Sequence, residues 1–270
     1  MTARSALCRY LRKWDLRPDG TLIETHTSWV QPVRAAGEAA MLKVLKPNSD
    51  EQAGADVLRY FGGVGAVRLI EGDHHAWLME RARDDVWLST IAVSGDDDRA
   101  AAILADCVAQ LHAPRDVAAP AGLTRLDEWF QSLFAREAEL PIFGRCATVA
   151  RRLLATEREI LVLHGDLHHG NVLHSARGWL AIDPKGLVGE RTYEVANLLC
   201  NPQPHGDIVH RPERMLRIAT LYAERLELDV QRVLGFALAH AGLSAAWSLE
   251  DGRDASYRVK CAEVLDPLVA

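Results

Sequence analysis

The sequence predicts an α+β protein in two lobes, the first rich in strands and the second rich in helices. Residues 21–45 and 66–80 hold β-branched and apolar runs of strand length, bounded by turn residues. From about residue 85 onward, apolar residues recur at helical spacing. A short apolar run and a hairpin signal interrupt the helices between residues 160 and 182. We expect this hairpin to lie at the cleft between the lobes.

Composition excludes several classes of protein. The chain has 270 residues, of which 49% are hydrophobic and 25% charged, so it can build a packed core and is not disordered. A net charge of −6 without a basic run argues against a nucleic-acid partner and suits a cationic small molecule. The five scattered cysteines and the lack of a membrane-length apolar run predict a cytoplasmic protein with no membrane partner.

The first lobe is expected to span residues 1–81. Apolar residues between Leu7 and Trp14 stand at helical spacing and predict a short amphipathic helix. The remaining elements are strands over 21–30 and 40–45 joined by a turn at 35–38, a helix over 50–61, and a hairpin of strands 66–70 and 76–80. The chain then leaves the sheet, which places the boundary of the lobe near Arg81.

The second lobe is expected to span residues 82–270 and to be mainly helical. One predicted helix runs from Ala100 to His112 and is stopped by Pro114. Further helices are predicted over 126–140, 146–158, 191–199, 211–225, 229–247 and 255–268.

Lys43 stands inside the apolar strand of residues 40–45. A lysine in such a strand is uncommon without a partner, because burying its charge is costly. The alternative is that Lys43 lies on an edge strand and extends its charge into solvent.

The central stretch runs from the strand 160–163 through His164-Gly165-Asp166-Leu167-His168-His169-Gly170-Asn171. Strands over 172–174 and 179–182 then flank a hairpin turn at 175–178. Because the hairpin brings the chain back, Asp183 is expected beside Asp166 and Asn171. Mg²⁺ takes one or two carboxylates together with substrate phosphates. Asn171 and Asp183 suit such an ion, which leaves Asp166 to face a hydroxyl.

Four histidines around this loop raise the alternative of a transition-metal site. The H-E-x-x-H spacing of helical zinc sites is missing, so this alternative is set aside. His164 is expected to hydrogen-bond the backbone of the loop. His168 and His169 are expected to shape the loop or to line the cleft.

His164, Asp166, Leu167 and Asn171 stand at the offsets of the protein-kinase catalytic loop H-R-D-L-x-x-x-N. Gly165 replaces the arginine, and Asp183-Pro184-Lys185 replaces D-F-G. The loop resembles the aminoglycoside phosphotransferase branch of the kinase-like fold. Residues 182–190, 242–247 and 43–69 are similar to the streptomycin 6-kinase type, the aminoglycoside/hydroxyurea resistance kinase family. The resemblance covers nearly the whole chain.

The resemblance implies a bilobal kinase-like fold that uses ATP and Mg²⁺. Asp166 would be the catalytic residue that accepts the proton of the hydroxyl, and Asn171 and Asp183 would hold the metal. Lys43 would grip the phosphates, with Glu51 on the next helix holding Lys43. Two further nucleotide contacts are implied: Ser28, in a turn that replaces the glycine-rich loop, and the hinge at Glu80 and Ala82, where backbone groups bind adenine.

The implied activity is phosphorylation of an alcohol group on a streptomycin-like aminoglycoside, an antibiotic inactivation. Glu190 and Glu194 follow the metal-binding aspartate and are expected to pair with a cationic substrate, because charge-assisted pairs are strong. The alternative for these acids is a solvated face, and Trp247 is expected in the core rather than on the substrate.

Two other functions stay open. One is a kinase for another metabolite, such as an amino sugar. The other is a catalytically silent kinase-like protein that binds nucleotide. The presence of Lys43, Asp166, Asn171 and Asp183 argues against the silent alternative, since such a protein has no need for all four.

Overall fold

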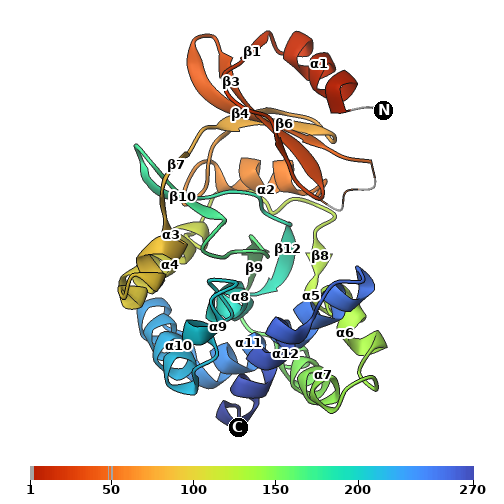
Figure 1. Ribbon diagram of the computed structural model, residues 1–270, viewed down its shortest axis with the longest axis vertical. Coiled ribbons are helices and arrows are strands. Elements are labelled where there is room, and N and C mark those ends of the chain that lie inside the picture. Colours follow the sequence, from red (N-terminus) through yellow and green to blue (C-terminus); the bar gives the residue numbers. More distant parts are fainter. Residues whose placement is uncertain (1–2, 48, 50) are drawn as a thin grey trace.

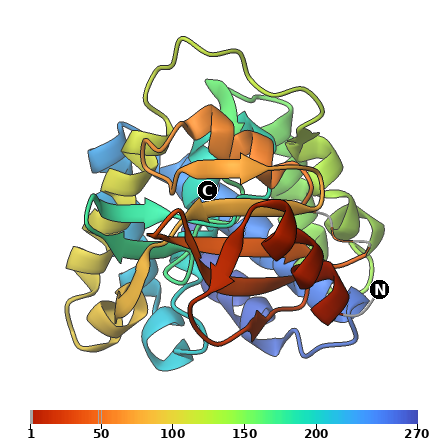
Figure 2. The same cartoon turned by 90° about the horizontal axis from the view of Figure 1, so that it is seen from above.

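The computed structural model describes residues 3–47, 49 and 51–270. A strand-rich part lies above a helix-rich part, with short strands between them (Figure 1). Seen from above, the sheet of the first lobe lies over the second lobe (Figure 2). The predicted α+β, two-part arrangement is confirmed.

The first lobe is built on a six-stranded antiparallel sheet in the order β1-β3-β4-β6-β5, with β2 paired to β3. Its strands are β1 Leu16–Pro18, β2 Ile23–Glu24, β3 Ser28–Ala35, β4 Glu38–Leu45, β5 Leu69–Gly72 and β6 Ala76–Glu80. The helix α1 Ala3–Lys13 packs on one face of this sheet, against Trp29, Val33 and Val44. Because side chains alternate along a strand, Lys43 points to the opposite face.

Two predicted elements of this lobe begin elsewhere. The predicted strand over 21–30 is broken after Glu24, where Oγ1 of Thr25 accepts the backbone N–H of Ser28 at 3.0 Å and turns the chain. The predicted helix over 50–61 is α2 Gly54–Phe61. Its predicted start, Asp50, lies outside the described residues, and Glu51 precedes the helix instead of standing on it.

Helices make up most of the second lobe. They are α3 Leu88–Val93, α4 Asp97–Leu111, α5 Leu126–Trp129, α6 Gln131–Ala135, α7 Pro141–Leu154, α8 Ala196–Leu199, α9 Gly206–Val209, α10 Pro212–Leu226, α11 Val230–Glu250 and α12 Ser256–Leu265, with 3₁₀ turns at Arg191–Val195 and Asp266–Leu268. The predicted helix over 126–140 is thus two short helices. Helix α11 is the longest and is buried between α7 and α12. Among the described residues, no helix combines the length and the apolar character needed to cross a bilayer.

Two small sheets lie between the lobes. One has the order β11-β10-β7, with β7 Arg83–Trp87, β10 Val172–Ser175 and β11 Gly178–Ala181. The other has the order β8-β12-β9, with β8 Thr124–Arg125, β9 Ile160–Leu163 and β12 Leu187–Glu190. The predicted strand and hairpin of residues 160–182 are confirmed, whereas β7, β8 and β12 were not predicted. The boundary near Arg81 stays a prediction, although the chain does leave the six-stranded sheet after Glu80.

The contact between α11 and α7 generates a prediction about stability. A Cβ on Gly242 would lie 2.6 Å from Cβ of Cys146, whereas a Cβ on Gly235 would lie 3.3 Å from the tip of Leu153. We predict that Gly242→Ala lowers the free energy of unfolding by about 1–3 kcal/mol through overpacking. Gly235→Ala, in the same helix, is the matched control. It should be neutral or slightly stabilising, because alanine favours a helix by about 1 kcal/mol over glycine. Urea unfolding of both variants is the measurement, and equal effects would contradict the packing argument.

Candidate active site

A first cavity of about 420 Å³ opens between the six-stranded sheet and the hairpin β10–β11. Its apolar walls come from Val30 and Met41 on one side and from Leu173 and Ile182 on the other. The chain at 80–82 closes one edge. Polar side chains also line the cavity: Thr25, Ser28, Lys43, Asn171 and Asp183. The space therefore combines an apolar slot for a planar ring with a cluster of charged and polar groups.

The predicted nucleotide contacts Ser28, Glu80 and Ala82 line this cavity, and the side chains of Ser28 and Glu80 have partners within the protein. Both carboxylate oxygens of Glu80 accept hydrogen bonds from Arg177, at 3.0 and 2.6 Å, and this pairing lowers the pKa of Glu80. Arg177 belongs to the turn between β10 and β11, so the pair joins the two lobes. Oγ of Ser28 is buried and lies 2.8 Å from Oγ1 of Thr25. Ala82 also lies on the cavity wall.

Lys43 does not extend into solvent. Its side chain is only 3% exposed, and Nζ lies 2.6 Å from Oε2 of Glu51 and also contacts the carboxylate of Asp183. The ammonium group stands 4.9 Å from the centre of the Trp77 ring on the neighbouring strand. A buried lysine is thereby paired with two carboxylates on the cavity side of the sheet.

Glu51 binds two lysines rather than one. Its Oε1 accepts hydrogen bonds from Nζ of Lys185 at 2.5 Å and from Oγ1 of Thr27 at 3.0 Å, while Oε2 faces Lys43. Burial by itself would raise the pKa of Glu51, but the charges of Lys43 and Lys185 outweigh burial and lower the pKa to about 2. The carboxylate is therefore ionised at neutral pH.

Asp166 lies at the end of β9, in a loop held by two asparagines. Nδ2 of Asn171 donates to the backbone oxygen of Asp166 at 2.8 Å, and Nδ2 of Asn197 donates to its Oδ1 at 3.1 Å. Burial raises the pKa of Asp166, and the nearby charges of His168 and Lys185 oppose that effect. The carboxylate is thus oriented by hydrogen bonds from neutral amides, and an oriented carboxylate can accept the proton of a hydroxyl placed beside it.

The hairpin brings Asp183 back beside this loop. The backbone N–H of Ile182 donates to the backbone oxygen of Asn171 at 2.9 Å, so the next residue starts opposite the loop. Asp183 has φ of 64°, a conformation that costs energy for a residue with a side chain and is concentrated at functional sites. Its carboxylate is 35% exposed at the cavity.

Asn171 and Asp183 present a donor set that suits Mg²⁺. Because Nδ2 of Asn171 is engaged with Asp166, the amide oxygen stands on the opposite branch of the side chain. One amide oxygen and one carboxylate, completed by phosphate oxygens, are typical of magnesium. In the described part of the chain, no group of three or more His, Cys, Asp or Glu side chains forms a metal cage.

The loop is anchored by His164, as predicted. Its Nε2 lies 2.7 Å from the backbone oxygen of Ile182, and its Nδ1 accepts the backbone N–H of Asp166 at 3.3 Å. Burial lowers the pKa of His164. The neutral ring thus donates on one side and accepts on the other, which links the loop to the hairpin.

The structure does not support Glu194 as a substrate ligand. Its buried carboxylate accepts the backbone N–H groups of His164 and Gly165, at 2.7 and 3.0 Å, and lies 3.4 Å from Nε2 of His112. Burial would raise the pKa of Glu194, but these hydrogen-bond partners, His112 foremost, lower it. Glu194 therefore fixes the backbone of the loop that carries Asp166, by accepting two of its N–H groups.

Glu190 does not line the cavity described above either. It ends the unpredicted strand β12, is buried, and forms a two-pronged ion pair with Arg232 of α11, with Nε at 2.8 Å from Oε1. The backbone N–H of Arg158 donates to Oε2 at 3.1 Å. The sequence argument took Glu190 to face the substrate because it follows Asp183, whereas Leu187–Glu190 pairs with β9 and Glu190 is buried.

Asp166 lines a second cavity, of about 620 Å³. Asp166, Glu250 and Asp251 supply its carboxylates, while cationic side chains and two aromatic rings complete its lining: Lys185, Arg253, Arg258, Trp129 and Trp247. Contrary to expectation, Trp247 is only partly buried and packs edge-on against Trp129, with ring centres 4.8 Å apart. Asp166 thus borders a large polar space suited to an acceptor molecule.

Sequence reasoning missed most of this second cavity. Trp129 donates through Nε1 to the hydroxyl of Tyr193 at 2.8 Å, and that hydroxyl lies 2.8 Å from Nδ1 of His240. Because burial lowers the pKa of His240 to about 3, its ring is neutral, and its Nδ1 can accept a hydrogen bond from the Tyr193 hydroxyl. These residues come from three distant segments. Apart from Asp166, the signal in the sequence was the Asp183-Pro184-Lys185 motif, since Lys185 follows a predicted metal ligand by two residues.

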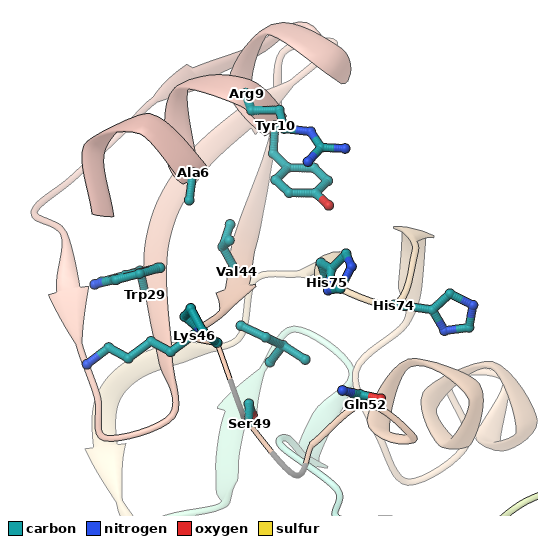
Figure 3. A pocket seen from close by; sticks show the side chains of 12 residues that line it. Ala6, Arg9, Tyr10, Trp29, Val44, Lys46, Ser49, Gln52, His74 and His75 are labelled. Carbon is teal, nitrogen blue, oxygen red and sulfur yellow. The ribbon is translucent and has the colours of Figure 1, made fainter. Parts of the chain in front are cut away.

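A separate pocket of about 270 Å³ lies between α1 and the other face of the first-lobe sheet. Tyr10, Trp29, Lys46 and His75 surround it (Figure 3). Trp29 and Val44 alternate with Ser28 and Lys43, so the sheet separates this pocket from the first cavity. This pocket is not part of the candidate active site.

The chain matches the profile of the aminoglycoside/hydroxyurea antibiotic resistance kinases over residues 13–252. It is 45% identical to a streptomycin 3''-kinase of Klebsiella pneumoniae over 246 residues, covering 90% of this chain and 92% of that protein. A streptomycin 6-kinase of Streptomyces griseus is 35% identical, with coverage of 91% and 83%, and a hydroxyurea phosphotransferase of Kitasatospora aureofaciens is 35% identical, with coverage of 96% and 77%.

Solved structures share the fold at low sequence identity. The aminoglycoside phosphotransferase APH(4)-Ia superposes with a TM-score of 0.67 at 16% identity, covering 98% of each chain. A choline kinase of Streptococcus pneumoniae superposes with a TM-score of 0.62 at 11% identity, covering 97% of this chain and 96% of that chain. The kinase-like fold predicted from the catalytic loop is therefore confirmed.

The anchoring role of Glu194 generates a prediction. In Glu194→Gln, an amide N–H₂ group would face one of the two backbone N–H donors of His164 and Gly165. One donor would lose its acceptor, which costs about 1–3 kcal/mol when the group is buried. We expect a lower unfolding midpoint in urea and a slower enzyme. Glu263→Gln, at an exposed pair with Lys260, is the control and should stay within about 0.5 kcal/mol of the parent. Equal stability of the two variants would rule out the anchoring role.

Proposed function

This chain belongs to the aminoglycoside/hydroxyurea antibiotic resistance kinase family, and on that premise we propose that it transfers the γ-phosphoryl group of ATP to a hydroxyl of a streptomycin-like aminoglycoside. The observation that carries the proposal is the position of Asp166. It lines the large polar cavity, and Asn171, which lines the apolar cavity together with Lys43 and Asp183, donates a hydrogen bond to its backbone oxygen.

The first cavity is the proposed nucleotide site. Its apolar walls suit adenine, and the backbone at 80–82 supplies hydrogen-bonding groups at the edge of the ring. Lys43, held by Glu51, binds the phosphates as a fixed positive charge. Asn171 and Asp183 would hold Mg²⁺, which neutralises phosphate charge when bound. In this proposal, the contact between Lys43 and Asp183 opens to admit the phosphates.

Asp166 is the proposed catalytic residue. Its carboxylate, oriented by Asn197, accepts a hydrogen bond from the acceptor hydroxyl and aligns the oxygen with the γ-phosphorus. The oxygen–phosphorus bond to the acceptor forms while the bond from the γ-phosphorus to the β–γ bridging oxygen breaks. The hydroxyl proton passes to Asp166, and ADP leaves. Phosphoryl transfer of this kind depends mainly on positioning and on charge stabilisation.

The second cavity is the proposed acceptor site. A volume of about 620 Å³ is in the range of sites for drug-sized ligands, and it is far larger than a molecule such as hydroxyurea needs. Carboxylates at 250 and 251 would exchange their present partners, Arg136 and Arg253, for guanidinium groups of the acceptor, while Trp129 and Trp247 offer apolar faces to a sugar ring. These features favour a streptomycin-like acceptor over a small neutral one.

A panel of acceptors tests the proposal. ADP release is measured with Mg·ATP and streptomycin, an amino sugar or hydroxyurea, and the product is identified by phosphorus NMR. We expect turnover with streptomycin. The NMR spectrum then identifies the phosphorylated hydroxyl, because the relatives are named for two different positions, 3'' and 6. Turnover with the amino sugar alone would support the proposed mechanism and contradict the proposed streptomycin-like acceptor. Nucleotide binding without turnover on any acceptor would favour the catalytically silent alternative.

The role of Asp166 generates a prediction for the variant Asp166→Asn. An amide cannot take the proton of the hydroxyl, so kcat should fall by about 10²–10⁴-fold. Affinity for Mg·ADP, measured by titration calorimetry, should stay close to that of the parent, because Asp166 is not among the groups assigned to the nucleotide. Asp106→Asn, at an exposed pair with Arg225, is the control and should leave both quantities unchanged. Loss of ADP binding together with activity would contradict the role.

The acceptor site generates a prediction for the double variant Glu250→Gln/Asp251→Asn. Losing a charge-assisted hydrogen bond costs about 1.5–3 kcal/mol, so the KM for streptomycin should rise roughly tenfold or more. The KM for ATP should not change, since the nucleotide occupies the other cavity. Added salt should reduce the difference, because exposed charges are screened. If the KM for streptomycin is unchanged, the two carboxylates do not bind the acceptor.

A further inference from the structure

Lys185 lines the second cavity and shares a carboxylate partner, Glu51, with Lys43 of the first cavity. It follows Asp183 by two residues, its backbone N–H donates to the backbone oxygen of His164 at 2.8 Å, and its side chain lines the acceptor cavity beside Asp166. Its Nζ reaches back to Oε1 of Glu51 at 2.5 Å. The side chain is 18% exposed, so the ammonium group borders the cavity instead of being enclosed in the core.

The two lysines lie on opposite oxygens of one carboxylate. Lys43 reaches Oε2 of Glu51 from the nucleotide side, and Lys185 reaches Oε1 from the acceptor side. A phosphate chain that extends from the first cavity toward Asp166 must therefore end near Lys185. Its terminal phosphate carries the most charge, and an ammonium group is a flexible point charge suited to binding it.

We propose that Lys185 is a second phosphate-binding residue, which contacts the γ-phosphoryl group during transfer, while Lys43 binds the phosphates nearer to the ribose. This proposal rests on the proposed phosphotransferase function. In the absence of nucleotide, Glu51 holds Lys185 at the border of the cavity. When nucleotide binds, Nζ donates to an oxygen of the γ-phosphoryl group and remains protonated throughout. The proton of the acceptor still goes to Asp166, and the leaving group is still ADP.

Thr27 provides a second hydrogen-bond donor to Glu51, which allows Lys185 to change partners. Its Oγ1 also donates to Oε1 of Glu51, at 3.0 Å, so the carboxylate keeps a hydrogen bond on that oxygen when Lys185 turns toward phosphate. Lys43 stays on the other oxygen. Glu51 is therefore not left buried without a partner, a state that would cost several kcal/mol.

The test compares two nucleotides that differ only at the γ-phosphate. We expect Lys185→Met to weaken binding of a non-hydrolysable ATP analogue by about ten- to a hundredfold, the loss of one charge-assisted hydrogen bond, while the Kd of Mg·ADP stays the same. The kcat with streptomycin should fall by about 10²–10³-fold, as for removal of one group that stabilises transition-state charge. Lys43→Met should weaken both nucleotides. Lys260→Met, an exposed lysine of α12, is the matched control and should change neither.

A merely structural tether gives a different result. If Lys185 serves only to join Glu51 to the second lobe, Lys185→Met lowers the melting temperature and weakens both nucleotides equally, and the proposal is overturned. Lys185→Arg, which keeps the charge, should retain most of the preference for the ATP analogue.

A measurement on the unmodified protein covers the case in which variants do not fold. Acetylation of lysines is followed by mass spectrometry, and Lys185 should be protected by the ATP analogue but not by ADP. Equal protection by both would overturn the proposal. If the parent binds both nucleotides and phosphorylates no acceptor, the proposed function fails, yet the difference at Lys185 is still measurable because binding needs no acceptor. The two failures are thus distinguishable.

Discussion

The buried carboxylate of Glu51, between two lysines, fixes the positions of the charged groups in the candidate active site. Burying Lys43 alone would cost several kcal/mol, and Glu51 offsets that cost only because it is itself buried with a good geometry. The three side chains come from β4, from the segment before α2, and from the segment after β11. Any displacement of one lobe against the other separates charges in a poorly solvated place. The sheet, the helix and the catalytic loop are therefore bound to a common arrangement.

The parts of the site that the sequence predicted are those fixed by local geometry. Asp166, Asn171 and Asp183 lie within one loop and one hairpin, and the hydrogen bond between Ile182 and Asn171 follows from the register of that hairpin. Lys43 was recognisable because a charge in an apolar strand demands an explanation. The two-lobe fold followed in the same way, from strand and helix periodicities that tertiary contacts did not override.

The parts that escaped prediction depend on contacts between distant segments. Glu190 and Glu194 looked like substrate ligands because acids following a metal-binding residue suggest a binding face. Nothing local indicated that β12 would pair with β9, or that Arg232, far along the chain, would meet Glu190. The second cavity escaped prediction for the same reason, because its lining comes from helices and loops that meet only in the folded chain.

The two ends of helix α11 have different surroundings. Its first turns carry Arg232, Gly235 and Phe236 into the core, and its last turns carry Ser244, Trp247 and Glu250 to the acceptor cavity. Side chains that reach the cavity at positions 244, 247 and 250 can therefore vary without disturbing the packed first half of the helix. The lining of the cavity and the packing of the core are set by different residues of the same helix.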